Sequence, residues 1–213
     1  MSNNLIIMKK GFVFFLSLVS IIILNGCSDT MGNPDDIYVD ESIDVTYSKG
    51  NANAKVIVTQ FGEYQCQFCS KFAMEILPMI QEDYIEPGKI LFIFKDFPLP
   101  NKENSQKASE ATYCAGDQGE EKYWEMHIKL SENFDALEVE NLYSYAEELG
   151  LETNAFKTCL DNGKYKNLVL RNRQQGIRLD VNNNPTLIIN NEKLVGLQPY
   201  ENIVKVIDTH LKE

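Results

Sequence analysis

The chain has 213 residues, a formal net charge of −11 and 44% hydrophobic residues. This length accommodates one domain with a sizeable core, and the ten tyrosines and eleven phenylalanines argue against a chain that is disordered throughout. The excess of acidic residues makes a nucleic-acid backbone an unfavourable partner. The five cysteines are an odd number, which leaves one sulfur unpaired in an oxidising compartment.

A short apolar segment follows a pair of lysines near the N-terminus. The lysines are Lys9 and Lys10, and the apolar run over residues 12–24 is shorter than the roughly 20 residues of a bilayer-spanning helix. The run leads to Cys27 in a pattern that resembles the lipobox of bacterial lipoproteins. We therefore predict a signal peptide over residues 1–26, lipidation of Cys27, and an extracytoplasmic protein anchored by lipid to a bacterial membrane. An uncleaved anchor with an unrelated cysteine is the alternative.

The segment after the predicted lipidation site has no apolar period. Residues 27–54 are rich in acidic residues and in glycine, asparagine and serine. This composition predicts a flexible tether, with the folded domain occupying residues 55–213.

Two apolar segments flank a helical pattern at the start of this domain. Val56–Phe61 and Ile90–Phe94 are apolar almost throughout, which is typical of strands buried on both faces. Between them, apolar residues recur at three- and four-residue spacing over residues 68–84. The pattern predicts two parallel strands joined by a right-handed helical crossover.

The remainder of the chain is helical before it returns to strands. Residues 100–176 show helical spacing without a strand-like run. Thr186–Ile189 is predicted to be the third strand, with Lys193–Val195 returning beside it through an Asn-Asn turn. Pro199 opens a last amphipathic helix. The order predicts an α/β fold with an all-helical insertion between the second and third strands of the core.

The residues that carry chemistry come shortly after the first strand. Cys66 and Cys69 form a Cys-x-x-Cys motif at the start of the predicted helix, and residues three apart on a helix share a face. Cys66 would lie at the helix N-terminus, where unpaired N–H groups and the helix dipole stabilise a thiolate. We therefore predict that Cys66 is the nucleophile and that Cys69 resolves the mixed disulfide.

Two structural interpretations of the motif stand beside the redox one. The two cysteines could form an inert disulfide. They could also be half of a zinc site, but zinc needs four ligands, the chain has no second Cys-x-x-Cys motif, and His127 and His210 are isolated. We predict neither a metal site nor a cofactor.

Four stretches in order along the chain resemble one family. Residues 61–69 are similar to the active-site segment of the DsbA-like thiol-disulfide oxidoreductases of the thioredoxin superfamily. Residues 95–99 resemble the family's exit from its second strand, residues 123–127 a signature of its helical insertion, and residues 184–186 its cis-proline loop. The resemblance begins at about Lys55 and runs to the C-terminus, and it implies a thioredoxin fold with a helical insertion.

The resemblance also implies a role for the loop before the third strand. In this family the proline that corresponds to Pro185 is cis and packs beside the cysteine pair. A cis bond there exposes backbone at Asn184 and Pro185 for an extended substrate. From the residues alone, Pro185 would only begin a strand.

Two departures from the family's pattern bear on what kind of oxidoreductase this chain is. The dipeptide Gln67-Phe68 carries no positive charge, where strongly oxidising relatives often have proline and histidine, so the thiolate gains less stabilisation. Gln60 stands six residues before the first cysteine, where many relatives carry a buried carboxylate that relays protons to the resolving cysteine. Glu63 and Lys95 are candidates to replace that carboxylate, and a surface position is the alternative for both.

The two remaining cysteines each fall in a helical part of the insertion. Relatives sometimes have a second disulfide here, and the oxidising compartment favours a bridge between Cys114 and Cys159. Two buried free thiols are the alternative. With Cys27 lipidated, the bridge would account for the odd number of cysteines.

These observations together predict an enzyme, a thiol-disulfide oxidoreductase that forms disulfide bonds in exported proteins. Its partners would be reduced or misoxidised exported proteins and a membrane redox protein, either a quinone-linked oxidase or an electron donor. A disulfide reductase or isomerase is the closest alternative. A thioredoxin-fold binding lipoprotein or metal chaperone with a structural cysteine pair is the alternative from another class.

Overall fold

The computed structural model describes residues 47–213. The predicted signal peptide, the predicted lipidation site Cys27 and most of the predicted tether lie outside these residues. Within the described part, no helix is both long enough and apolar enough to cross a membrane.

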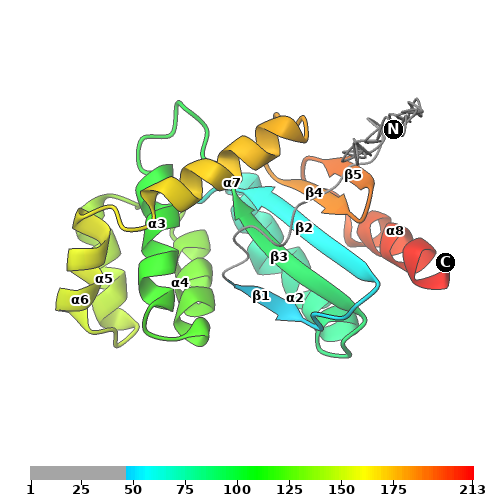
Figure 1. Cartoon of the computed structure of the whole chain (residues 1–213), viewed down its shortest axis with the longest axis horizontal. Helices are drawn as coiled ribbons and strands as arrows, with labels where there is room; N and C mark the ends of the chain where they lie inside the picture. Colours follow the sequence, from blue (N-terminus) through cyan, green and yellow to red (C-terminus); the bar gives the residue numbers. More distant parts are fainter. Residues whose placement is uncertain (1–46) are drawn as a thin grey trace, which may run out of the picture. The chain divides into compact units, whose positions relative to one another are not determined.

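A five-stranded sheet runs through the middle of the described part (Figure 1). Its strands are β1 (Ser48–Gly50), β2 (Val56–Gly62), β3 (Ile90–Asp96), β4 (Thr186–Ile189) and β5 (Glu192–Val195). They lie in the order β1-β3-β2-β4-β5, with β2 and β3 parallel and the other neighbouring pairs antiparallel. The central parallel pair is buried along almost all of its length, as its continuous apolar sequence predicts.

The sheet begins before the domain boundary that the sequence predicts at Lys55. Ser48–Gly50 pairs antiparallel with β3, with Lys49 opposite Phe92. Three residues that include a lysine and a glycine carry no apolar alternation, so the pattern gives no sign of a strand here. The tether predicted over residues 27–54 is therefore too long at its C-terminal end.

The residue before β1 is also packed into the domain. The ring of Tyr47 stacks on Tyr123, with ring centroids 4.3 Å apart. A Cβ atom added at Gly116 would lie 2.4 Å from the Tyr47 hydroxyl, so the glycine leaves the space that this tyrosine fills. Tyr47, the first described residue, thus packs against the helical insertion.

The helical segments follow the order that the sequence predicts. A continuous run of α1 (Gln67–Lys71), η1 (Phe72–Ile76), α2 (Leu77–Ile80) and η2 (Gln81–Ile85), in which η1 and η2 are π-helical, joins β2 to β3. The others are α3 (Ser105–Gly116), α4 (Glu120–Glu132), α5 (Val139–Glu148), α6 (Thr153–Asp161), α7 (Lys166–Arg178) and α8 (Tyr200–Lys212). Because α3 to α7 all lie between β3 and β4, the helical insertion between the second and third core strands is confirmed.

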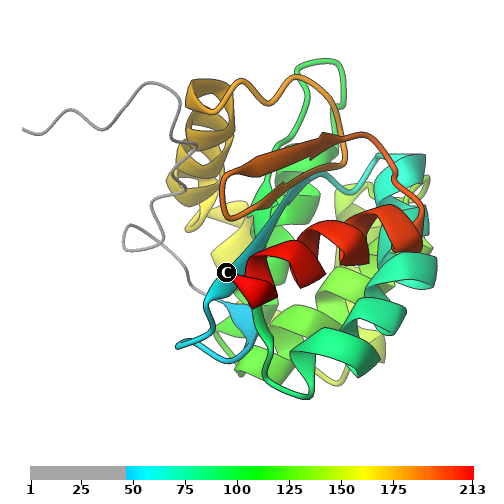
Figure 2. The ribbon, with the colours of Figure 1, turned by 90° about the vertical axis from the view of Figure 1, so that its right-hand side faces the viewer.

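Helices cover both faces of the sheet. Val58, Phe92 and Ile189 lie side by side in the register and belong to the main core, together with apolar residues of the α1–η2 segment and α8. Phe61 and Ile188 belong to a second apolar cluster, and Figure 2 shows α7 on the opposite side of the sheet from α8.

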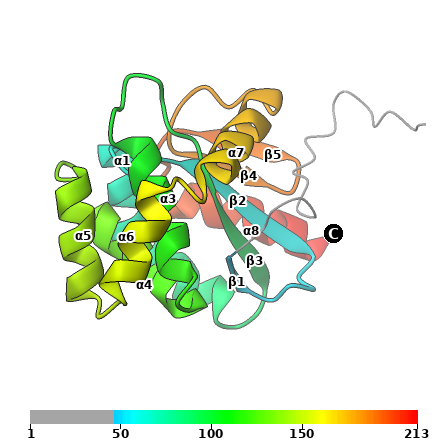
Figure 3. The ribbon, with the colours of Figure 1, turned by 60° about the vertical axis from the view of Figure 1, so that its left-hand side comes forward.

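The remaining helices of the insertion gather at one end of the sheet, beside α1 (Figure 3). Helix α4 packs against α1 and η1. The insertion is therefore positioned to support the segment that begins with the Cys-x-x-Cys motif.

Candidate redox active site

The Cys-x-x-Cys motif lies where the chain passes from β2 into helix. Cys66 is the N-cap residue of α1 and has an extended backbone, and Cys69 follows within the helix. The backbone N–H of Cys69 donates a hydrogen bond to Cys66 Sγ at 3.1 Å. Both cysteines are free thiols in this structure.

The two sulfurs differ in exposure and in acidity. Cys66 is partly exposed, whereas Cys69 is 5% exposed. A hydrogen bond from the Cys69 side chain, helped by the backbone N–H groups of Cys69 and Phe68, lowers the pKa of the Cys66 thiol. Burial raises the pKa of the Cys69 thiol well above its ordinary value, and the hydrogen bond and charge of Cys66 raise it further. One sulfur is thus suited to attack and the other to remain protonated.

The loop before β4 lies directly against Cys66. The Asn184–Pro185 peptide bond is cis. Cys66 Sγ donates a hydrogen bond to the Asn184 carbonyl at 3.8 Å, across 118 residues of sequence. The Asn184 side chain in turn donates to the Phe97 carbonyl at 3.0 Å, which fixes this loop to the segment after β3. The structure therefore brings Cys66, Cys69, Asn184 and Pro185 together.

A glycine leaves room beside the buried sulfur. A Cβ atom added at Gly62 would lie 3.5 Å from Cys69 Sγ, 3.2 Å from Gln60 Nε2 and 3.1 Å from the Phe94 ring. Gln60 is 1% exposed, and its Oε1 atom accepts no hydrogen bond from the described residues. An uncharged amide therefore lies close to the buried Cys69 sulfur, and an amide does not take up or release a proton in the physiological range.

The surface alternative for Glu63 and Lys95 is wrong, because these side chains are 1% and 2% exposed. Burial raises the pKa of the Glu63 carboxyl, and its charge acts to raise the pKa of both active-site thiols. Lys95 pairs in register with Phe61, whereas Gln60 pairs with Phe94. Since neighbouring residues of a strand face opposite sides, Lys95 lies on the other face of the sheet from Gln60.

His127 is packed under the active-site loop. Its Nδ1 atom shares a hydrogen bond of 2.8 Å with the Tyr64 hydroxyl, and its ring centroid lies 4.7 Å from that of Phe94. Burial lowers the pKa of the imidazole to about 3, so the ring is neutral. The contact supports Tyr64, two residues before the first cysteine of the motif.

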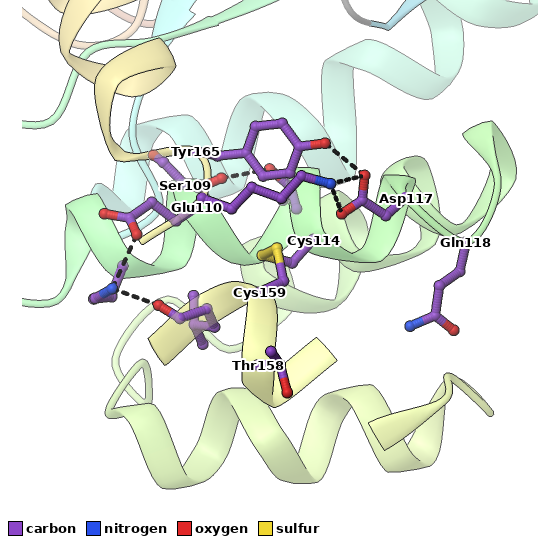
Figure 4. The surroundings of a disulfide bond; sticks show 12 residues. Ser109, Glu110, Cys114, Asp117, Gln118, Thr158, Cys159 and Tyr165 are labelled. Atoms are coloured by element: carbon purple, nitrogen blue, oxygen red, sulfur yellow. Dashed lines mark hydrogen bonds and ion pairs between the residues drawn. A yellow bond between two sulfur atoms is a disulfide. The ribbon is translucent and has the colours of Figure 1, made fainter. Parts of the chain in front are cut away.

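The second pair of cysteines joins two helices of the insertion (Figure 4). Cys114 of α3 and Cys159 of α6 form a disulfide, with their Cα atoms 5.8 Å apart. Close by, the Asp117 carboxylate accepts hydrogen bonds from Lys164 Nζ and the Tyr165 hydroxyl, each at 2.6 Å. The end of α3 is thus tied both to α6 and to the segment that leads into α7.

A buried polar network, which the sequence did not reveal, links three elements behind the site. Asp96 Oδ2, at the end of β3, accepts hydrogen bonds from the Tyr113 hydroxyl of α3 at 2.8 Å and from Asn172 Nδ2 of α7 at 3.0 Å. The local signals for Asp96 were its place at the end of a buried strand and within residues 95–99, which resemble the family's exit from its second strand. Its partners are 17 and 76 residues away and belong to no motif.

The arrangement can be compared with known proteins. A family model described as thioredoxin matches residues 43–209. The chain belongs to the thioredoxin family. Within this family, it is 26% identical over 171 residues to disulfide bond formation protein D of Bacillus subtilis (strain 168), and the match covers 76% of each chain. It is also 26% identical over 227 residues to the probable disulfide bond formation protein D of Bacillus anthracis, covering 100% of this chain and 99% of that relative.

Solved structures show the same fold. The oxidised BdbD of Bacillus subtilis superimposes with a TM-score of 0.70 at 24% identity, covering 78% of this chain and 92% of the other. The thiol-disulfide exchange protein alpha-DsbA2 of Wolbachia pipientis gives a TM-score of 0.68 at 26% identity, covering 78% and 88%. The predicted thioredoxin fold is confirmed, and the chain is a DsbA-like thiol-disulfide oxidoreductase.

Proposed function

We propose that this protein is an extracytoplasmic disulfide oxidase that forms disulfide bonds in exported proteins. Cys66 is its nucleophilic cysteine and Cys69 its resolving cysteine. The observation that carries the proposal is the different placement of the two sulfurs: Cys66 is partly exposed at the N-terminus of α1 and accepts the Cys69 N–H, whereas Cys69 is 5% exposed. This placement lowers the thiol pKa of Cys66 and raises that of Cys69. A stabilised thiolate favours the reduced enzyme over its disulfide, and so favours electron flow from substrate to enzyme.

The reaction proceeds by two thiol-disulfide exchanges. A substrate thiolate attacks Cys66 Sγ in the Cys66–Cys69 disulfide, forming a mixed disulfide while Cys69 leaves and takes up a proton. The second substrate thiolate then attacks the substrate sulfur of the mixed disulfide, and Cys66 leaves as a thiolate. The substrate loses two electrons to form its disulfide, and both enzyme cysteines are left reduced.

The substrate binds beside the exposed end of the motif. Phe68, between the two cysteines, is 59% exposed and offers an apolar surface next to the partly exposed Cys66. The backbone of Asn184 and Pro185 is proposed to bind an extended substrate segment, in keeping with the contact between Cys66 and the Asn184 carbonyl.

We further propose that the protein is held at a bacterial membrane by lipid on Cys27, after removal of residues 1–26. The short apolar run and its flanking lysines support this assignment. A membrane redox partner, a quinone-linked oxidase, then returns the active-site pair to its disulfide. The names of the two Bacillus relatives as disulfide bond formation proteins support the direction of the reaction.

The reduction potential of the active-site couple tests the direction. We expect equilibration with glutathione to give a value between about −230 and −120 mV, because Gln67-Phe68 stabilises the thiolate less than a positively charged dipeptide would. The wild type should also speed the oxidative refolding of a reduced disulfide protein, and the Cys66→Ala variant should not.

A potential near or below −300 mV, with no effect of Cys66→Ala on refolding, would contradict the oxidase proposal. A value near −270 mV, together with reduction of protein disulfides by the dithiol form, would favour the reductase or isomerase alternative.

A further inference from the structure

The Glu63 carboxylate is enclosed between the active-site loop and the start of α3. Its Oε2 atom accepts a hydrogen bond from the Gln65 backbone N–H at 2.8 Å. Gln65 Oε1 accepts the backbone N–H of Asn104, the N-cap residue of α3, at 2.9 Å. The loop that carries Glu63 is therefore fixed immediately before Cys66, and the Glu63 side chain is held away from water at 1% exposure.

The main chain around Glu63 touches the resolving cysteine. The backbone N–H of Glu63 is one of the groups that act to lower the pKa of Cys69. The preceding residue, Gly62, would place an added Cβ atom 3.5 Å from Cys69 Sγ. The main chain of Glu63 thus lies next to the Cys69 sulfur, and the charge of its side chain acts on both active-site thiols. One carboxylate oxygen accepts no hydrogen bond from the described residues.

We propose that Glu63 holds the active-site couple at a less oxidising potential by placing a buried negative charge beside both sulfurs. This inference rests on the proposed redox role of Cys66 and Cys69. The reduced enzyme carries a thiolate on Cys66, whereas the disulfide carries no charge. A nearby carboxylate therefore raises the free energy of the reduced form relative to the disulfide. Glu63 is a positioning residue, since it acts through Cys66.

The charged and titratable groups around the Glu63 carboxyl determine the pH range in which it destabilises the Cys66 thiolate. Burial raises the pKa of Glu63, and the Ser105 hydroxyl, the Gln65 backbone N–H and the charge of Lys102 act in the opposite direction. The charge of Glu63 in turn acts to raise the pKa values of both active-site thiols. The repulsion exists only while Glu63 and Cys66 are both charged, so it disappears as the pH falls far enough to protonate either.

The test compares Glu63→Gln with the wild type. The amide keeps an oxygen for the Gln65 N–H but carries no charge. We expect Glu63→Gln to lower the pKa of Cys66. The measurement is the rate of alkylation of Cys66 as a function of pH. The substitution should also shift the equilibrium with glutathione about tenfold toward the reduced enzyme, which corresponds to about 30 mV. Both differences should shrink at acidic pH. Glu103→Gln, on an exposed side chain of the loop before α3, is the matched control and should change neither value.

A charge-conserving variant separates charge from structure. Glu63→Asp should stay close to the wild type in both measurements, and unfolding curves should show that all variants are folded. The inference is overturned if Glu63→Gln leaves the Cys66 pKa and the equilibrium constant unchanged, or if Glu63→Asp shifts them as far as Glu63→Gln does. If the wild-type pair does not exchange with glutathione at all, the proposed function itself fails.

Discussion

The sulfur of Cys66 accepts a backbone hydrogen bond at the start of α1, whereas the sulfur of Cys69 lies within the helix and is 5% exposed. The same side chain is therefore accessible for attack in one position and buried in the other. This difference leads to a prediction about trapped intermediates, because in the proposed reaction the mixed disulfide forms on Cys66 and is resolved either by Cys69 or by the substrate.

We expect the Cys69→Ser variant to retain a reactive Cys66 thiolate and to accumulate mixed disulfides with reduced substrate proteins after mild oxidation. Cys66→Ser should form none, because the remaining thiol is buried. Non-reducing gels of both variants, incubated with the same substrate, provide the measurement. Equal amounts of adduct from the two variants would mean that the roles are wrongly assigned.

The sequence predicted that these cysteines lie at the start of a helix, because a strand, a Cys-x-x-Cys motif and a helical pattern are consecutive in the chain. The burial of Glu63 was not predictable in the same way. It depends on the start of α3, where Asn104 binds Gln65 from 39 residues away. A glutamate followed by a tyrosine and a glutamine carries no local sign that another segment will cover it.

Among the secondary-structure elements, β3, α3 and α7 are joined by the Asp96–Tyr113–Asn172 network. Burial raises the pKa of Asp96, while the hydrogen bonds from Tyr113 and Asn172 act in the opposite direction. A buried carboxyl that loses one of its donors has no water to replace it, so each donor contributes more than a surface hydrogen bond would.

Tyr113→Phe removes one donor without creating a large cavity. We expect it to lower the free energy of unfolding by about 1–3 kcal/mol, measured by urea denaturation. Tyr143→Phe is the matched control, because the Tyr143 hydroxyl binds Asp161 on the exposed surface. The control should change stability by less than about 0.5 kcal/mol. Equal effects of the two substitutions would show that the buried hydrogen bond contributes no more to the free energy of unfolding than the surface one does.

The elements themselves were largely predictable, since buried strands and amphipathic helices leave periodic patterns. Strand β1 was missed because its pairing with β3 depends on the partner strand rather than on the residues Ser48–Gly50. The network around Asp96 was missed for a related reason. Its members come from three elements that only the folded topology brings together.

At the scale of the whole molecule, the Cys114–Cys159 disulfide closes a loop with a sequence separation of 45. In the chain-entropy view, such a bridge stabilises by limiting the unfolded chain, by about 4 kcal/mol for this loop length. We expect Cys114→Ala/Cys159→Ala to lose up to that amount in urea denaturation. The variant and the protein with which it is compared should both carry Cys66→Ala/Cys69→Ala, so that they differ only in the Cys114–Cys159 pair. An unchanged unfolding free energy would contradict the structural role.

His127 makes stability depend on pH. Its folded pKa is about 3, below the unfolded value of about 6.5, so the unfolded chain binds a proton that the folded protein does not. Stability is therefore lost as the pH falls below about 6.5. Glu63 and Asp96 titrate in the opposite sense, since burial raises their pKa values. Only a comparison with a His127 variant isolates the histidine.

We expect the wild type to lose about 2 kcal/mol more unfolding free energy between pH 7 and pH 5 than His127→Gln does. Urea denaturation at the two pH values is the measurement. The same pH dependence in wild type and His127→Gln would mean that His127 is not held neutral by the fold.

The packing of Tyr47 against Tyr123 and over Gly116 also determines how far the enzyme can travel. If lipid holds Cys27 at the membrane, as proposed, the segment from Cys27 to Tyr47 can reach at most about 70 Å, at roughly 3.5 Å per residue. Its outer end is fastened to the helical insertion. The Cys66 sulfur can then react only with proteins in the layer of solvent next to the bilayer. Within that layer the local concentration of the anchored enzyme is raised.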